Sequence, residues 1–241
     1  MAACAAGAAC AVGACAATTA QAADADEEGR RIAYAPPNNR VESLAEQHAM
    51  IRANSFGLLA CALDGTDAGP QLHASHLPFV LDAERGPLGT LIVHVARNNP
   101  LWQDLEMRGE ATVIFSGPHH YISPRWDGAM VPTWDFEAVY VRASVRVLGD
   151  EESAAALGAL IEQSESKLAA EADDSAAEPG GWTAGGVPES ELRGLRRHIM
   201  AMELTITQLE AKRKMGQNRA PLLRRLCGSA LARVLSHSQL K

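Results

Sequence analysis

The chain has 241 residues, of which 47% are hydrophobic and 21% charged, and its formal net charge at pH 7 is −7. This length and apolar content suffice for a sizeable core in one domain with a small appendage. An acidic chain is not typical of a protein whose whole surface binds nucleic acid. No run approaches the roughly 18–20 apolar residues that cross a bilayer as a helix, so the sequence predicts no membrane span.

Charge is unevenly distributed along the chain. Residues 211–241 contain eight of the 22 Lys and Arg and no Asp or Glu, which gives +8; residues 1–210 contain the other 14 and all 29 acidic residues, which gives −15. A basic end on an acidic body can attract phosphate, an acidic partner or the body itself. We expect residues 220–241 to form a basic helical tail.

The first 31 residues are Ala-rich and end in an acidic run, with no Lys or Arg before Arg30. A secretory signal would need a basic start, so we interpret residues 1–31 as a disordered leader outside the fold. The five cysteines include no C-x-x-C pair, which argues against a disulfide framework or a zinc cluster. A reducing, cytoplasmic location fits this pattern, and residues 32–219 form the expected domain.

Hydrophobic periodicity and turn residues predict the elements of that domain in chain order. Helices are expected over 41–53, 98–107, 150–170 and 188–197, and strands over 56–63, 72–81, 90–96, 111–115, 138–148 and 199–209. Strands outnumber helices and are mostly joined by turns. The pattern therefore favours a mainly β protein with α-helices (α+β), a barrel or sandwich with helices packed outside.

The stretch from Thr112 to Phe136 contains two of the four tryptophans and is interrupted by Gly and Pro. Prolines fix φ and remove N–H donors, so the stretch cannot be a central strand throughout. We expect its aromatic and histidine side chains to lie on irregular backbone between strands, where binding residues are common. A core-facing aromatic corner is the alternative.

The two histidine pairs in the sequence are not arranged to bind one metal ion together. His73 and His76 stand three apart on an expected strand, which places them on opposite faces, and the adjacent His119 and His120 fail for the same reason. We therefore expect no metal site. The sequence also lacks G-x-S-x-G, G-x-G-x-x-G and P-loop motifs.

Two segments have the composition of anion sites. In HVARNNPLW, a strand ends at Arg97 and passes through Asn98 into a helix N-terminus, where free N–H groups, the dipole and a guanidinium attract phosphate. In KRKMGQNR, Lys214, Gln217 and Asn218 supply charge and amides that can hydrogen-bond a ring edge or a phosphate. The alternatives are a local ion pair of Arg97 with a helix cap at Asn98, and a solvated basic turn.

Six motifs in this order resemble the PaiB family of FMN-binding negative transcriptional regulators, over about residues 34–219. They are NSFGLL (54–59), SHLPF (75–79), HVARNNPLW (94–102), VIFSGPHHYISPRW (113–126), VPTWDF (131–136) and KMGQNR (214–219). The resemblance implies an FMN-binding split β-barrel of the flavin-reductase and pyridoxamine-oxidase type with peripheral helices. It also implies a homodimer with FMN in a groove between the subunits.

The resemblance assigns roles by position. His94, Arg97 and Asn98 would meet the FMN phosphate. Lys214, Gln217 and Asn218 would close over the cofactor, from the other subunit in one arrangement, and Trp134 and His76 would neighbour the flavin ring. This chain departs from the family pattern in three places: Gly216 stands where serine is usual, Asp135-Phe136 where Asn-Tyr is usual, and Arg125-Trp126-Asp127 where Ser-Trp-Tyr is common.

Three functions compete at this level. The first is a repressor of transcription, acting directly on DNA through the basic tail or through a regulatory protein partner. The second is an FMN-dependent oxidoreductase acting on a small molecule, with His76, His120 and Tyr121 as possible acids or bases. The third is haem binding in the same groove, with His120 or His237 as iron ligand.

Overall fold

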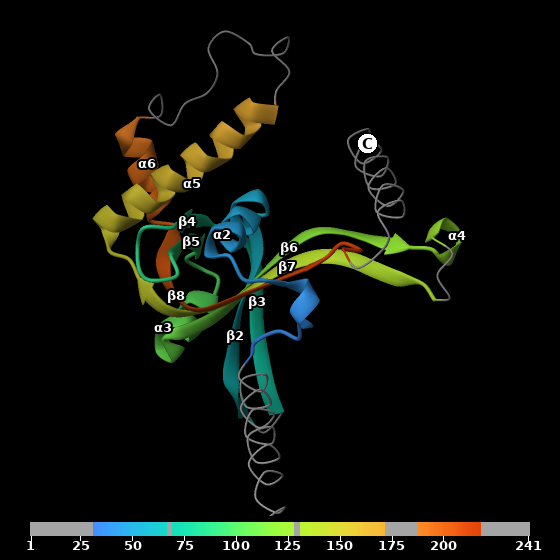
Figure 1. Cartoon of the computed structure of the whole chain (residues 1–241). Coiled ribbons are helices and arrows are strands. Elements are labelled where there is room, and N and C mark those ends of the chain that lie inside the picture. The colour runs from blue at the N-terminus through green and yellow to red at the C-terminus, as the bar shows by residue number, and fades with distance from the viewer. Residues whose placement is uncertain (1–30, 67–68, 128–130, 172–187, 218–241) are drawn as a thin grey trace, which may run out of the picture. The chain divides into compact units, whose positions relative to one another are not determined.

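We describe the protein from a computed structural model, which covers residues 31–66, 69–127, 131–171 and 188–217 (Figure 1). The chain divides into two compact units, Met1–Tyr34 and Ala35–Lys241, and the elements below belong to the second. Its helices are η1 (Pro37–Asn39), α2 (Leu44–Ala53), α3 (Leu101–Arg108), α4 (Pro124–Asp127), α5 (Asp150–Glu171) and α6 (Glu189–Arg196). Its strands are β1 (Arg40–Val41), β2 (Phe56–Thr66), β3 (Gly69–Pro78), β4 (Val80–Asp82), β5 (Thr90–Ala96), β6 (Glu110–Ile122), β7 (Thr133–Val147) and β8 (Ile199–Lys214).

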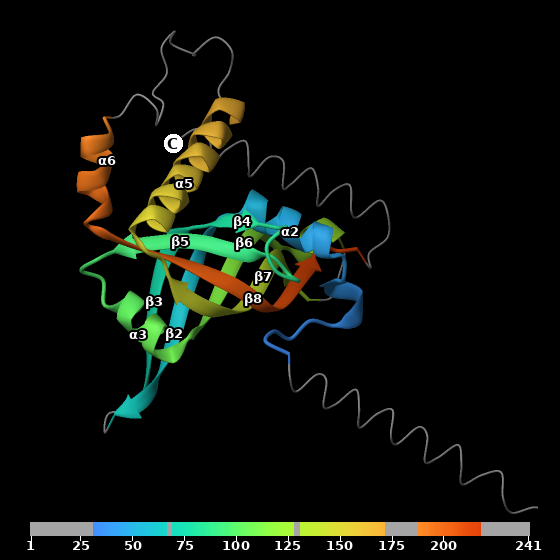
Figure 2. The same ribbon diagram turned by 90° about the vertical axis from the view of Figure 1, so that its left-hand side faces the viewer.

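The described strands form one eight-stranded sheet in the order β3-β2-β6-β7-β8-β5-β4, with β1 paired to β8. Every pairing in it is antiparallel. Strand β8 connects the two halves, because its first part pairs with β5 and most of its length pairs with β7. The sheet is open and strongly curved (Figure 2). The expected mainly β fold with peripheral helices, of the split-barrel type, is confirmed.

The hydrophobic core lies against one face of this sheet. Alternate residues of β7 and β5 point into it, and Val139, Val141 and Val93 are at most 1% exposed. Helices α2 and α3 cover this core face through Ile51 and Leu105, which belong to the same cluster of buried side chains. Each large side chain buried here contributes about 1.5–3 kcal/mol by leaving water. We call the opposite side of the sheet the outward face.

Helix α5 covers one part of the outward face. It packs on β5 and β8 and buries Ala156 and Leu160, neither of which belongs to the main core cluster (Figure 2). Two side chains fasten it: Gln163 donates from Nε2 to the carbonyl of Phe79 at 2.8 Å, and Lys167 donates from Nζ to the carbonyl of Arg52 at 2.7 Å. The first part of β8 is therefore enclosed on both faces.

A buried carboxylate, Glu203 on β8, lies at the start of α5. Arg146 Nε donates to it at 2.5 Å and Arg85 donates from the other side. The hydrogen bond from Arg146 is the main cause of the lowered pKa of Glu203, with smaller help from the charge of Arg85. Arg146 also binds Glu152 in the first turn of α5 and lowers the pKa of Glu152 to about 2. Both carboxylates are thus ionised at neutral pH, and the ion-pair network links helix to sheet.

The structure corrects the expectation for residues 112–136. Strand β6 continues to Ile122 and β7 begins at Thr133, so the histidine and aromatic side chains lie on paired strands, not on irregular backbone. One bulge absorbs the Gly117-Pro118 interruption: both residues stand opposite Glu137 alone, and pairing resumes at His119. Figure 1 shows the ends of β6 and β7 extending as an arm with α4 at its tip.

Other boundaries differ less. The strand expected over 72–81 is divided at Phe79 into β3 and β4, and β3 is an edge strand that ends at Pro78, where the missing N–H costs no ladder bond. Strand β8 runs five residues beyond its expected end at 209, as far as Lys214. The leader (1–31) and the tail (220–241) lie outside the described residues, apart from Arg31. Among the described helices, none is both long and apolar enough to cross a membrane.

Candidate functional site

The first predicted anion site lies where β5 passes through a turn into α3. Arg97 donates from Nε to the carbonyl of Arg197 at 2.7 Å and from Nη2 to the carbonyl of Ile199 at 3.1 Å. Its backbone N–H also bonds to the carbonyl of His198 at 2.8 Å. Arg97 therefore joins the end of β5 to the start of β8, and only part of its guanidinium faces solvent. A phosphate role for it stays a prediction.

Asn98 follows Arg97 in the same turn and is exposed. The next residue, Asn99, caps α3 by accepting from the N–H of Leu101 at 3.0 Å, and it donates to Ser75 Oγ on β3 at 3.0 Å. The side-chain bond at the helix start thus comes from Asn99, one residue after the position that the sequence indicated. The turn and β3 are held side by side at the entrance to α3, where the helix dipole favours an anion although the N–H groups of Leu101, Gln103 and Asp104 are already bonded.

His94 lies away from this turn. Its strand neighbours Val93 and Val95 point into the core, so the His94 ring is on the opposite face, the one on which α5 packs β5. Burial lowers the pKa of His94, which keeps the imidazole neutral at pH 7. Within the described ranges its Nδ1 has no hydrogen-bond partner. The structure therefore separates His94 from Arg97 and Asn98, although the three are close in sequence.

The second predicted group lies at the far end of β8. Lys214 donates from Nζ to Thr133 Oγ1 at 2.5 Å and to the carbonyl of Trp134 at 2.7 Å. The Gln217 amide bonds to Asn38 O and Asn39 Oδ1, both at 3.0 Å. Gln217 thus fastens the N-terminal end of the domain to the turn after β8. Asn218 lies outside the described residues.

The outward face carries the predicted ring neighbours. His76 of β3 stacks on Phe56 with centroids 6.0 Å apart, and Trp134 of β7 packs edge-on against Tyr121 of β6 at the same distance. Phe56 is 63%, Trp134 54% and Tyr121 44% exposed, although large aromatic side chains are usually buried. On the adjacent strand Lys212 lies over the Phe136 ring at 5.0 Å from its centroid. Aromatic faces beside a cation suit a flat, electron-poor ring.

The two groups do not meet in one protomer. Arg97 contacts the first residue of β8 and Lys214 is its last. A strand of 16 residues at about 3.3 Å per residue places its ends up to about 50 Å apart, less for its curvature. A single flavin mononucleotide cannot contact both ends. Convergence of the two groups therefore requires a second copy of the chain.

Two features of the structure were not predicted from the sequence: a cavity, and a pair of neighbouring buried side chains on the arm. A cavity on the outward face is lined by residues that include Arg142 and Thr112. The only signal in the sequence was the alternation along β7, which places Arg142 on its polar face. His120 and Asp135 are cross-strand neighbours on the arm, buried and without hydrogen-bond partners among the residues that the structure describes. The signal for them was the Asp at a position where the resembling family has Asn.

Comparison with known proteins identifies the family. Residues 33–208 match the family described as "Putative FMN-binding domain". An uncharacterized protein of Emericella nidulans is 31% identical over 197 residues, covering 70% of this chain and 78% of the relative. The "Protease synthase and sporulation protein PAI 2" of Bacillus subtilis is 29% identical over 189 residues, covering 77% and 83%.

Solved structures agree on the fold. "Structure of the FAD and Heme binding protein from Mycobacterium smegmatis" matches with a TM-score of 0.51 and 15% identity, covering 74% of each chain. At that identity the match shows the fold alone. The family match, in contrast, covers most of the chain, confirms the resemblance given by the six motifs, and supports a flavin as cofactor. The chain belongs to the PaiB-like family of FMN-binding split-barrel proteins.

Proposed function

We propose that this chain binds FMN as a homodimer and acts as a negative regulator of transcription of the PaiB type, in the cytoplasm. The observation that carries the flavin part is the outward face, where Trp134, Tyr121 and Phe56 are exposed, Lys214 donates to the carbonyl of Trp134, and Lys212 lies over the Phe136 ring. An isoalloxazine ring stacks on aromatic side chains, and ammonium groups stabilise its anionic edge and its phosphate.

The flavin supplies redox chemistry when bound, and the chain's residues supply binding and orientation. In this proposal Trp134 and His76 flank the ring, while Lys214 faces the cofactor from the end of β8. Asn98 and the N–H groups at the start of α3 hold the phosphate, with the exposed part of Arg97 beside them. Because the two groups lie at opposite ends of β8, each site takes one group from each protomer.

The test of flavin binding is the absorbance spectrum of purified protein with mass spectrometry of what denaturation releases. We expect bands near those of free FMN, and a released mass equal to FMN. A Soret band in their place would favour haem, and no released chromophore even after incubation with FMN would refute the proposal.

Lys214→Gln should reduce FMN affinity roughly tenfold or more, because a charge-assisted contact is removed.

The regulatory part depends on contacts with DNA. The described body is acidic, whereas residues 219–241 contain five Lys and Arg and no acid. We propose that this basic end contacts the phosphate backbone of DNA, so affinity should fall steeply with salt.

Removal of residues 220–241 tests this mechanism. Fragments selected from genomic DNA by the full chain are assayed by mobility shift at several salt concentrations. The truncated chain should bind them about tenfold or more weakly and with a shallower salt slope. Equal affinity and slope for both chains would remove the basic end as the DNA contact. FMN content, measured in the same samples, checks that the domain is intact.

A further inference from the structure

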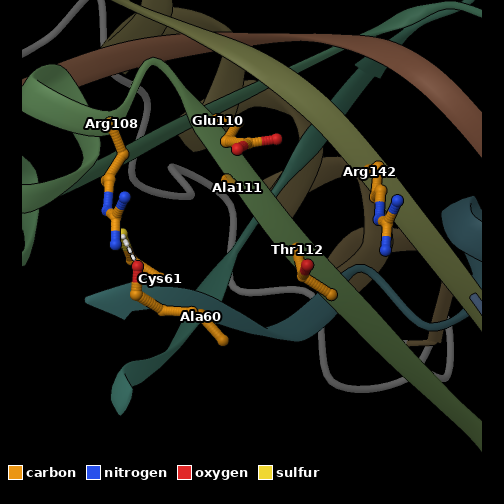
Figure 3. Close-up of a pocket in the computed structure, with 8 residues that line it drawn as sticks. Ala60, Cys61, Arg108, Glu110, Ala111, Thr112 and Arg142 are labelled. Carbon is orange, nitrogen blue, oxygen red and sulfur yellow. Dashed lines mark hydrogen bonds between the residues drawn. The ribbon is translucent and has the colours of Figure 1, made fainter. Parts of the chain in front are cut away.

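A cavity of about 330 Å³ opens on the outward face over β2, β6 and β7 (Figure 3). This volume is at the lower end of the range for small-molecule sites. The cavity has a floor of small side chains and charged side chains around it. The residues that matter for its chemistry are Ala60, Ala62, Thr112, Arg108, Glu110 and Arg142.

The hollow lies beside one cross-strand row of the sheet in which two of the three residues are small, at the point where the pairing of β2 with β6 ends. Ala60 pairs with Thr112, and Thr112 pairs with Arg142, so the three lie side by side across β2, β6 and β7. The next row, two residues along each strand, has large side chains in the same positions. That row consists of Leu58, Ile114 and Tyr140. The larger row forms a wall, and the row at Thr112 leaves room for a ligand.

Arg142 is an exposed positive charge at this cavity. Its guanidinium makes no hydrogen bond or ion pair with any residue in the described part of the chain. Arg146, four residues along the same face of β7, binds both Glu203 and Glu152. A guanidinium fork offers five donors arranged to fit a carboxylate or phosphate. Arg142 therefore presents unused oxyanion-binding capacity to the cavity.

Glu110 gives the cavity a second, opposite charge. Its carboxylate also has no hydrogen bond or ion pair among the described residues, and it lines the same cavity on β6. Figure 3 shows Glu110 between Arg108 on one side and Arg142 on the other. Glu110 and Arg142 do not bond each other, so each is free to contact a ligand. A carboxylate here would repel a simple anion, whereas it would hold a protonated amine.

The thiol of Cys61 is also in the lining, and it argues against covalent chemistry. Burial, with the nearby charge of Asp104, raises the pKa of Cys61. The thiolate is the nucleophilic form, so this cysteine is unreactive at neutral pH. The cavity is therefore suited to reversible binding.

We propose that this cavity binds a small zwitterion, a molecule whose oxyanion contacts Arg142 and whose protonated amine contacts Glu110. Amino acids and short aminoalkyl carboxylates have this chemistry. The residues that line it are not those of the proposed flavin site, although His76, a proposed ring neighbour, pairs with Leu58 in the adjacent row. A regulator with such a site would respond to the concentration of a small nitrogen-containing metabolite.

Titration calorimetry on the purified full chain tests the proposal with four probes of increasing charge separation: glycine, β-alanine, 4-aminobutyrate and 5-aminovalerate. We expect at least one to bind with a dissociation constant in the micromolar to low millimolar range. Propionate and propylamine, which each carry one of the two charges, should bind at least tenfold more weakly. No binding by any of the four, or equal binding by propionate, would overturn the proposal.

Variants locate the site. Arg142→Ala should weaken the best probe tenfold or more, and Ala62→Leu, at an exposed position, should do so by filling the cavity. Glu110→Gln should weaken the zwitterion but improve propionate binding, a reversal that misfolding cannot produce. Arg193→Ala on α6 removes the same charge elsewhere and should leave affinity unchanged. Unchanged affinity in Arg142→Ala would refute the assignment; FMN content, read in the same samples, reports separately on the flavin site.

Discussion

Replacing Asp135 with asparagine is expected to raise the free energy of unfolding at neutral pH by about 1–3 kcal/mol. Most substitutions at buried positions destabilise a protein, so an increase in the free energy of unfolding distinguishes this expectation from the usual effect of such a substitution. The reason is that Asp135 is 1% exposed and neither carboxylate oxygen has a hydrogen-bond partner in the described part of the chain. An unpaired buried carboxylate loses its hydration without compensation, whereas an amide of the same shape carries no charge.

The Lys and Arg side chains of the strand paired with this part of β7 already bind other groups. Lys214, which pairs with the adjacent Phe136, donates to Thr133 and to the carbonyl of Trp134. Arg213 binds Glu137 at 2.6 Å. The cross-strand neighbour His120 is itself buried, and neither ring nitrogen has a partner among the described residues. A carboxylate can only accept, whereas an amide at position 135 can also donate to an unprotonated ring nitrogen.

Urea denaturation of the two proteins measures the effect. Glu137→Gln is the matched control, because Glu137 lies two residues along β7 on the same face and its carboxylate is paired with Arg213. The same chemical change there should lower the free energy of unfolding, so the two variants should move in opposite directions. A loss of stability in Asp135→Asn would show that Asp135 has a partner in solution, such as a bound ligand or a second chain.

The sequence was informative where local pattern determines local structure. The alternation of Val141 and Val145 with Arg142 and Arg146 predicted β7 and the side of it that faces the core, and the structure agrees. The stretch around Gly117-Pro118 was misinterpreted because these residues usually end a strand. Here a bulge accommodates both opposite one residue, and pairing with β7 continues on the other side.

The site was less predictable because it depends on pairings between distant segments. Nothing near Arg97 in sequence indicates that its donors bond to carbonyls at 197 and 199, a hundred residues later. His94 shares a motif with Arg97, yet alternation along β5 turns its ring toward the face that α5 covers. The cavity beside Arg142 arises from three strands in register, which no single segment reveals.

The second large effect is expected in the FMN content of a heterodimer formed from two variant chains, each of which binds FMN poorly as a homodimer. Asn98→Asp places a negative charge where the phosphate is expected, and Lys214→Gln removes the cation at the far end of β8. Each variant alone should lose FMN, with affinity reduced at least tenfold. Asn98 is exposed, and glutamine at 214 still donates a hydrogen bond, so both chains should keep the wild-type melting temperature.

A heterodimer of the two variants decides how the site is composed. In a two-fold dimer whose sites each take Asn98 from one chain and Lys214 from the other, one site carries both changes and its mate carries neither. Heterodimer purified through two different affinity tags should therefore hold about half the FMN of the wild type at wild-type affinity. Sites built within single chains would each carry one change, and the heterodimer would then be as empty as its parents. Because the two groups lie at opposite ends of β8, we expect the half-filled result; an empty heterodimer would mean that both groups of each site come from one chain.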